Sequence, residues 1–464
     1  MSPKEYLNPE NKISNVERVV QQHPETAGLQ AYEYFRNTLS KQRDAYIAGD
    51  VDELDFKYPY LNLEAIEKIK EPMLESLIVL MPGEQNLKSK SLYSAIEYRY
   101  SELFMLDMAR VMNDESMPES DRKDAEEQFK ISSEALYGKP ELEVFSFIAS
   151  KTIKNDQIIS ESDSPTIKKL KNELRNLLGE IDESEYVPVS PSSETIELVH
   201  GLVIDKFEPV LSHIEIGNFY GVEGMVQAID TALDKLGGKD LGWTAVKTPD
   251  SNSLAVSAHQ KQLQVGENRK EISGKELKHK VIHELGVHGL RSMNAERAAW
   301  LSAAYGQEGY LNFEESLGTA LEDAYLSKYS SRGETYYLVA GLAYGLDHHE
   351  PRNFEETYEI MWRHNLLAKE INDPSEIDIT RAKTVAFNSC LRLFRGTTGK
   401  QKGVLLLKDL AYFNGQESVW KTLEDIKSKE DFDLLFSGKL DNSKSDQQLI
   451  AKLINDFLKS ISNN

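Results

Sequence analysis

The stretch that decides the fold of this chain reads Lys278-His279-Lys280-Val281-Ile282-His283-Glu284-Leu285-Gly286-Val287-His288. Two histidines flank a glutamate in a helix-like context, and their spacing is H-E-x-x-x-H. In a regular α-helix, residues four apart share a face, whereas five steps of about 100° place His288 roughly 140° away from His283. A straight helix therefore cannot direct both side chains at one metal ion.

One extra residue in the helical turn would bring the two histidines back to one face. Such a π-bulge is common at functional sites, and Gly286 lies between the histidines, where it could relax the helix. We therefore predict a distortion at 284–287. A bulged helix of this kind matches the H-E-x-x-H pattern of zinc peptidases, with Glu284 as the general base. With 10 histidines and 76 acidic residues in 464, chance seldom produces the pattern.

Two other interpretations of this stretch stay open. The two histidines could be unrelated residues on a normal helix. Alternatively, His279 and His283 are four apart and could hold a metal ion without any bulge. The second alternative is the weaker one, because Glu284 would then lack the partner spacing that a general base needs.

A third metal ligand is needed as well. A catalytic zinc ion usually takes three protein ligands and keeps one position for water. His283 and His288 would supply two, and Glu315 is the best-placed glutamate on a following helix. Spacing alone favours a simpler role, because Asn312 as N-cap would put Glu315 at the third helical position, where it closes a capping box.

The composition limits the possible partners and location. The net charge of −22 argues against nucleic acid and anionic membranes as main partners. Cys390 is the single cysteine, so no intrachain disulfide can form. The polar N-terminal segment lacks the apolar core of a signal peptide, and no apolar run is long enough to cross a bilayer. We expect a cytoplasmic protein, and its oligomeric state is not predicted.

The pattern along the chain predicts a mostly helical protein in two parts. Residues 1–190 are expected to form an all-α N-terminal region, and residues 191–464 a zincin-like α+β catalytic region with a small sheet. The boundary follows from Glu183–Ser193, where Pro188 and Pro191 stand among serines. The helices expected before it span residues 14–50, 63–81, 91–113, 122–136, 141–154 and 164–181.

Short strands are predicted directly before the histidine helix. They span 243–246, 254–258 and 262–265, and another is expected at 404–407. Ser273 followed by Glu276 predicts a capped start of the histidine helix. Zinc peptidases hold the substrate backbone on an edge strand above the metal, and the strand at 262–265 is the candidate for that role.

A cationic segment interrupts the otherwise acidic sequence between residues 388 and 412. A solvated loop would explain it. The alternative is an anion pocket in which Arg395 and Lys408 hold the terminal carboxylate of a peptide substrate. The basic residues of this segment face only Asp409, and they are Arg392, Arg395, Lys400, Lys402 and Lys408.

At these residues the chain resembles the tyrosine carboxypeptidase (MATCAP) family, whose microbial branch is described as flavohaemoglobin expression-modulating QEGLA-motif proteins. The H-E-x-x-x-H block is similar over 283–294. The QEGLA motif corresponds to Glu314-Glu315-Ser316-Leu317-Gly318, which departs from it at three positions. A third block covers Phe394–Gly399 and Lys408–Tyr412, and a weaker one covers Leu136–Pro140. The resemblance extends over roughly 130–425.

This resemblance implies a zinc metallopeptidase of zincin type. It implies that His283 and His288 bind zinc, that Glu284 is catalytic, and that Glu315 is the third ligand rather than a capping residue. We expect a carboxypeptidase that removes a C-terminal residue from a peptide or protein. The alternatives are an endopeptidase or aminopeptidase, and a non-catalytic metal-binding interaction protein.

Overall fold

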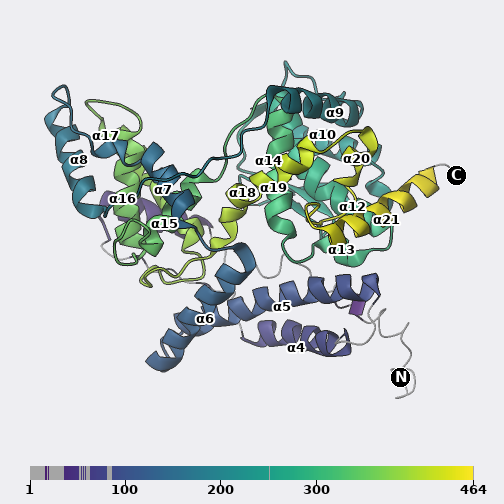
Figure 1. Cartoon of the computed structure of the whole chain (residues 1–464), viewed down its shortest axis with the longest axis horizontal. Helices are drawn as coiled ribbons and strands as arrows, with labels where there is room; N and C mark the ends of the chain where they lie inside the picture. Colours follow the sequence, from purple (N-terminus) through teal and green to yellow (C-terminus); the bar gives the residue numbers. More distant parts are fainter. Residues whose placement is uncertain are drawn as a thin grey trace.

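The computed structural model describes residues 36–51, 63–80, 86–249 and 251–462, together with positions 16, 17, 19, 54, 56 and 58. Helices dominate the described chain, and two small sheets accompany them (Figure 1). This confirms a predominantly helical α+β protein. Within the described ranges, no helix is both long and apolar enough to cross a membrane.

The first helices form a layer along the bottom of Figure 1, where α4 and α6 pack against the long helix α5. Asn86 caps α5 by accepting the backbone N–H of Ser89 at 2.9 Å. Part of the helix predicted over 14–50 lies outside the described residues. The layer consists of α4 (Leu63–Leu80), α5 (Leu87–Asn113) and α6 (Glu119–Tyr137). The preceding helix α3 (Arg36–Ala48) packs instead on α17 (Glu376–Leu393).

A second group of helices lies at the left of Figure 1 and combines segments that are far apart in sequence. In it, α7 packs on α15, and α8 packs on α16. The boundary expected near residue 190 stays a prediction, and helices from both sides of it pack together in this group. Its members are α7 (Leu142–Lys151), α8 (Pro165–Leu177), α15 (Glu334–Tyr344), α16 (Phe354–Leu367) and α17 (Glu376–Leu393).

The third group surrounds α14 (Tyr310–Tyr325), which packs against the helices that precede and follow it in sequence. Before it come α9 (Ser193–Leu211), α10 (Val222–Lys235), α11 (Gly274–Val281), η3 (Ile282–Gly289), α12 (Leu290–Arg297) and α13 (Leu301–Tyr305). After it come α18 (Ala411–Asn414), α19 (Gln416–Glu424), α20 (Lys429–Leu434) and α21 (Ser445–Ser462). Single turns are η1 (Asn155–Gln157), η2 (Lys239–Leu241) and η4 (Leu407–Leu410).

The larger sheet has the strand order β2-β4-β3, with β4 parallel to β2 and antiparallel to β3. The three strands predicted before the histidine helix are confirmed. The proposal that 262–265 is an edge strand is wrong, because β4 is paired on both sides. The strands are β1 (Phe219–Tyr220), β2 (Thr244–Thr248), β3 (Leu254–Ser257), β4 (Gln262–Gly266) and β5 (Ile272–Ser273), and β1 pairs with β5.

The strand predicted at 404–407 is also wrong. These residues are buried and apolar, as in a buried strand, but their backbone bonds go elsewhere. The Leu406 N–H donates to the carbonyl of Leu393 at 2.7 Å, and the Leu407 N–H donates to the Ser133 hydroxyl at 2.9 Å. The segment therefore packs as an irregular chain that leads into η4.

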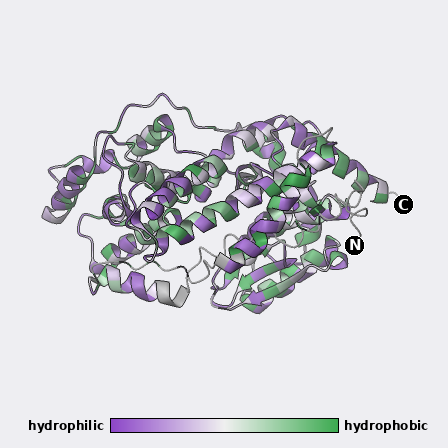
Figure 2. Cartoon of the chain, turned by 90° about the horizontal axis from the view of Figure 1, so that it is seen from below, coloured by the Kyte–Doolittle hydropathy of each residue, from purple (hydrophilic) through white to green (hydrophobic). Residues whose placement is uncertain are grey.

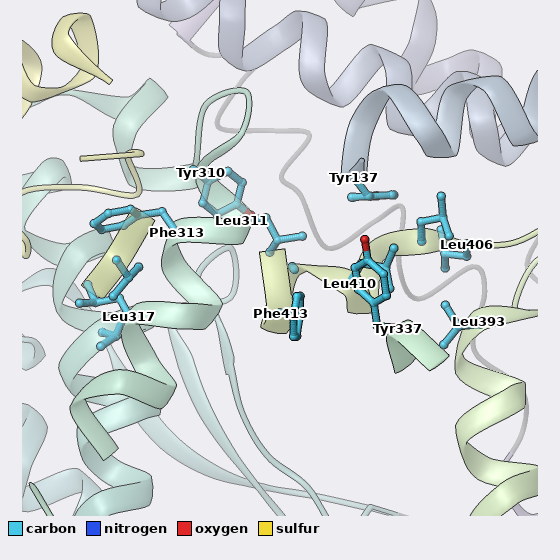
Figure 3. Close-up of a cluster of buried hydrophobic side chains, with 14 of the residues drawn as sticks. Tyr137, Tyr310, Leu311, Phe313, Leu317, Tyr337, Leu393, Leu406, Leu410 and Phe413 are labelled. Atoms are coloured by element: carbon cyan, nitrogen blue, oxygen red, sulfur yellow. The ribbon is translucent and has the colours of Figure 1, made fainter. Parts of the chain in front are cut away.

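Buried apolar side chains connect these groups. Figure 3 shows one such cluster, which runs from α14 through α18 and η4 to the ends of α6 and α17. In Figure 2, most helices carry both hydrophobic and hydrophilic residues, as expected when one face of each is buried. This packing fixes α14 relative to α18 and η4, and these three elements carry candidate site residues.

Candidate metal centre

The helix distortion predicted at 284–287 is confirmed. Residues Ile282–Gly289 form a π-helical segment, η3, between the regular helices α11 and α12. The wider turn brings the rings of His283 and His288 onto one side, with ring centroids 4.9 Å apart. An H-E-x-x-x-H spacing can thus present both histidines to one point.

Gly286 permits the close packing of this segment. A Cβ atom at this position would lie 2.8 Å from the ring of Phe207 on α9. Real Cβ atoms do not approach carbon atoms so closely, so a larger residue would push η3 and α9 apart. Glycine is therefore needed here for contact with a neighbouring helix, in addition to any effect on helix geometry.

The predicted capping role of Asn312 is wrong. The helix α14 begins at Tyr310, and its N-cap is Gly309, which has a positive φ of 79°. Asn312 and Glu315 therefore lie inside the helix. Glu315 has no cap to close, and its side chain is available for another role.

Glu315 completes a cluster with the two histidines. Its Oε2 atom lies 3.8 Å from Nε2 of His283 and 3.9 Å from Nε2 of His288. Ligand atoms around a tetrahedral zinc ion, at metal distances of about 2.0–2.1 Å, are separated by roughly 3.4 Å. The three potential ligand atoms lie within 4.8 Å of one another, so the donor set fits a zinc ion with little adjustment.

The Nδ1 atoms of both histidines face carboxylates of α14. His288 Nδ1 lies 2.8 Å from Glu314 Oε1, and His283 Nδ1 lies 3.5 Å from Glu322 Oε1. Each ring therefore has its Nε2 atom towards Glu315. A carboxylate hydrogen-bonded to the far nitrogen of a metal-binding histidine is a common arrangement, because it selects the tautomer that leaves the near nitrogen free. His288 has such a bond, whereas His283 Nδ1 makes no hydrogen bond to Glu322 at its longer distance.

His279 does not join the cluster. Its Nδ1 atom lies 3.9 Å from Glu322 Oε1, beside the Lys280 ammonium, which is 2.8 Å from the same oxygen. The three-residue group within metal-binding distance is His283, His288 and Glu315. The geometry of the described residues thus favours the bulged pair over the pair His279 and His283.

The electrostatics of the cluster favour a cation. Burial would lower the pKa of His288, but the negative charges of Glu315 and Glu314 outweigh it and raise this pKa to about 9. Burial would raise the pKa of Glu315, but the charges of His288, His283 and Lys408 lower it. The site thus stabilises a positive charge next to Glu315, whether a proton or a metal ion carries it.

Glu284 follows His283 on η3 and interacts with the cluster through its charge. Burial raises the pKa of Glu284 above its ordinary value, although the charges of His283 and His288 act in the opposite direction. A carboxylate with a raised pKa is a better proton acceptor than a solvated one. Glu284 thus has the property expected of a general base.

Tyr412 and Lys408 bring the cationic segment next to the cluster. The negative charge of Glu315, burial and a hydrogen bond to the same carboxylate raise the pKa of Tyr412 well above its ordinary value. Lys408 acts on both Glu315 and Asp409 by its charge. Of the two residues predicted to hold a substrate carboxylate, Lys408 is thus the one whose charge reaches the metal centre.

Arg395 is bound to a different partner, Asp409. It donates to Asp409 at 3.0 Å and to the carbonyl of Arg392 at 3.1 Å. Arg392 binds the same aspartate through two atoms, with its Nε at 2.8 Å, and its guanidinium lies 4.9 Å from the centre of the Tyr336 ring. The two arginines and Asp409 form one ion-pair group behind Lys408.

Gly318 leaves room for the ring of His283. A Cβ atom there would lie 2.7–2.8 Å from three atoms of the His283 ring. A side chain at this position would displace the ring, so glycine permits the close approach of His283 to α14.

The sequence reasoning missed Glu314, Glu322 and Tyr412. Glu322 had a detectable signal, because it follows Glu315 by seven residues and so shares its helix face. Tyr412 had none, since it is distant in sequence from the histidine helix. Comparisons with protein-family models, curated proteins and solved structures found no match to this chain.

Proposed function

We propose that this chain is a zinc metallopeptidase of zincin type that removes a C-terminal residue from a peptide or protein. The observation that carries the proposal is that the distorted helix η3 brings His283 and His288 together with Glu315 of α14. Glu284 lies next to His283 on the same distorted helix. Membership of the tyrosine carboxypeptidase family and a cytoplasmic location belong to the same proposal.

The donor set supports zinc as the metal. Two imidazole nitrogens and one carboxylate oxygen are the ligands of many catalytic zinc sites, which keep a position open for water. Zinc bound there would supply a Lewis acid that activates water and polarises the scissile carbonyl. No thiolate lies in the cluster, and the single cysteine, Cys390, is buried elsewhere.

The residues of the chain would divide the remaining work. Glu284 accepts a proton from the attacking water and passes it to the leaving amine as the C–N bond breaks. The Tyr412 hydroxyl is hydrogen-bonded to Glu315 and would hold the carboxylate of that ligand in place. The raised pKa of Tyr412 keeps this hydroxyl protonated at neutral pH.

The substrate would bind between the edge strand β3 and the ammonium group of Lys408. The edge strand β3 packs against η3, and its outer backbone groups can pair with an extended peptide. Lys408 can hold the terminal carboxylate, because its charge already reaches Glu315. Arg395, tied to Asp409, would support that position from behind.

The test combines metal analysis with a peptide panel. We expect about one zinc ion per chain in the wild type, loss of zinc in His288→Ala, and retained zinc in Glu284→Gln. The wild type should hydrolyse peptides with free C-termini and spare their amidated forms. Removing the general base in Glu284→Gln should slow hydrolysis by about 10²–10⁴-fold.

Each alternative has its own result. Cleavage of amidated peptides at internal bonds indicates an endopeptidase, and release of N-terminal residues indicates an aminopeptidase. A chain that binds zinc and hydrolyses no peptide fits a metal-binding interaction protein. Absence of zinc after supplementation would overturn the metal centre itself.

A further inference from the structure

Glu314 is a buried carboxylate with three donors. Its Oε1 atom lies 2.8 Å from His288 Nδ1 and 3.0 Å from the Lys439 ammonium, while its Oε2 atom lies 3.0 Å from Arg291 Nη1. Glu314 is 1% exposed. Two cations and an imidazole therefore surround this carboxylate, and such a set of donors favours its ionised form.

The two cations are fixed from outside α14. Arg291 is fully buried on α12 and also donates to Leu440 O and Asn442 Oδ1. The backbone N–H of Lys439 donates to the carbonyl of Ala303 at 2.7 Å. Since both cations are held by other parts of the chain, the carboxylate between them has little freedom to turn.

This arrangement decides which proton His288 carries. An ionised carboxylate can only accept hydrogen bonds, so the proton of a neutral His288 must sit on Nδ1. Its Nε2 atom then offers a free lone pair towards Glu315. A glutamine at 314 has one accepting oxygen and one NH2 group, so it would turn a donor towards either Arg291 or the His288–Lys439 side.

We propose that Glu314 is a positioning residue that holds His288 in the metal-binding tautomer and orientation, and that Arg291 and Lys439 require a carboxylate at this position. The inference rests on the proposed metal centre but not on peptide hydrolysis.

Three variants separate positioning from charge and from general stability. Glu314→Gln removes the charge and one acceptor, whereas Glu314→Asp keeps the charge but shortens the reach to His288. Lys439→Met removes a cation from the same group and leaves the acceptor of His288 in place. Zinc affinity is measured by competition with a chelating dye, and the His288 tautomer by nitrogen-15 NMR of the ring in the zinc-loaded protein.

We expect zinc affinity to fall about 10–100-fold in both Glu314 variants, as for other residues that orient metal ligands. The NMR signal of an Nδ1-protonated His288 should weaken in both. Lys439→Met should lower the denaturation midpoint and keep that tautomer signal, with a smaller loss of zinc affinity than in either Glu314 variant. Lys278→Met is the matched control, because Lys278 is a buried lysine paired with Glu208.

Two results would overturn the inference. If Glu314→Asp bound zinc like the wild type, charge alone would matter. If Lys439→Met or Lys278→Met lost zinc affinity as much as Glu314→Gln, the effect would be general destabilisation. Neither result depends on hydrolysis, so a chain that binds zinc but cleaves no peptide would overturn the proposed function and leave this inference intact.

Discussion

Two buried carboxylates of this chain, Glu314 and Asp347, are held by arginines in similar surroundings. Asp347 accepts both Arg352 Nη atoms at 2.7 Å and the Gly179 N–H at 2.8 Å. Arg352 also donates to the carbonyls of Leu342 and Leu177, so this group joins the ends of α8 and α15. Glu314 instead has a histidine of the candidate metal centre among its donors.

The difference lies in the third donor. Around Asp347 the third donor is the backbone N–H of Gly179, so this ion pair only connects two helix ends. Around Glu314 the remaining donor is an imidazole whose other nitrogen points at Glu315. The same buried ion-pair chemistry thus stabilises the fold in one place and orients a candidate ligand in the other.

The largest expected effect separates the two groups most clearly. Asp347→Asn leaves the buried Arg352 without its charged partner, and breaking a pair of this kind costs about 3–5 kcal/mol. Denaturant unfolding should show that loss, while zinc content and affinity stay at the wild-type value. A loss of zinc together with stability would erase the proposed distinction between Asp347 and Glu314.

Asp409 extends the comparison to a partly exposed ion pair and to pH. Burial would raise the pKa of Asp409, but Arg392 and Arg395 outweigh it and lower this pKa. Its contribution to stability is therefore present above the ordinary aspartate pKa and is lost as pH falls through the lowered value. Because Arg392 is 41% exposed, we expect Asp409→Asn to cost about 1–3 kcal/mol at neutral pH.

Unfolding measured from neutral pH down to strongly acidic pH tests this sign. The difference between wild type and Asp409→Asn should shrink as the solution becomes acidic. A difference that grows on acidification would contradict the assigned direction. Hydrolysis by this variant also reports on Lys408, whose neighbour would then have lost its charge.

The smallest effects come from paired glycine substitutions. Gly318→Ala places a Cβ atom 2.7–2.8 Å from the His283 ring, and we expect a stability loss of about 1–3 kcal/mol with weaker zinc binding. Gly201→Ala, inside α9 with open space around it, should stabilise the chain by about 0.5–1 kcal/mol. Equal zinc affinity in both variants would show that Gly318 is not needed to place His283.

The sequence predicted the local features that depend on spacing. The helical character, the three strands before the histidine helix and its Ser273 cap follow from apolar periodicity and capping chemistry, which act over a few residues. The distortion at 284–287 followed from helix geometry alone, given that both histidines should face one point.

The errors concern features that depend on distant partners. The strand at 262–265 is central rather than an edge, because strand order is set by pairing with residues far along the chain. Residues 404–407 have strand-like composition, yet Ser133 and Leu393 satisfy the backbone there. Asn312 does not cap α14, because the helix begins earlier, after Gly309.

From the sequence alone it follows that His283 and His288 can face one point only if the helix between them is distorted. The constraint comes from the angle by which each residue turns a regular α-helix. Only the tertiary structure decided what stands around them. Packing of α14 against η3 brings Glu314, Glu315 and Glu322 to the two rings, and segments near residues 410 and 440 add Tyr412 and Lys439. Such contacts join residues more than twenty positions apart, and no local pattern encodes them.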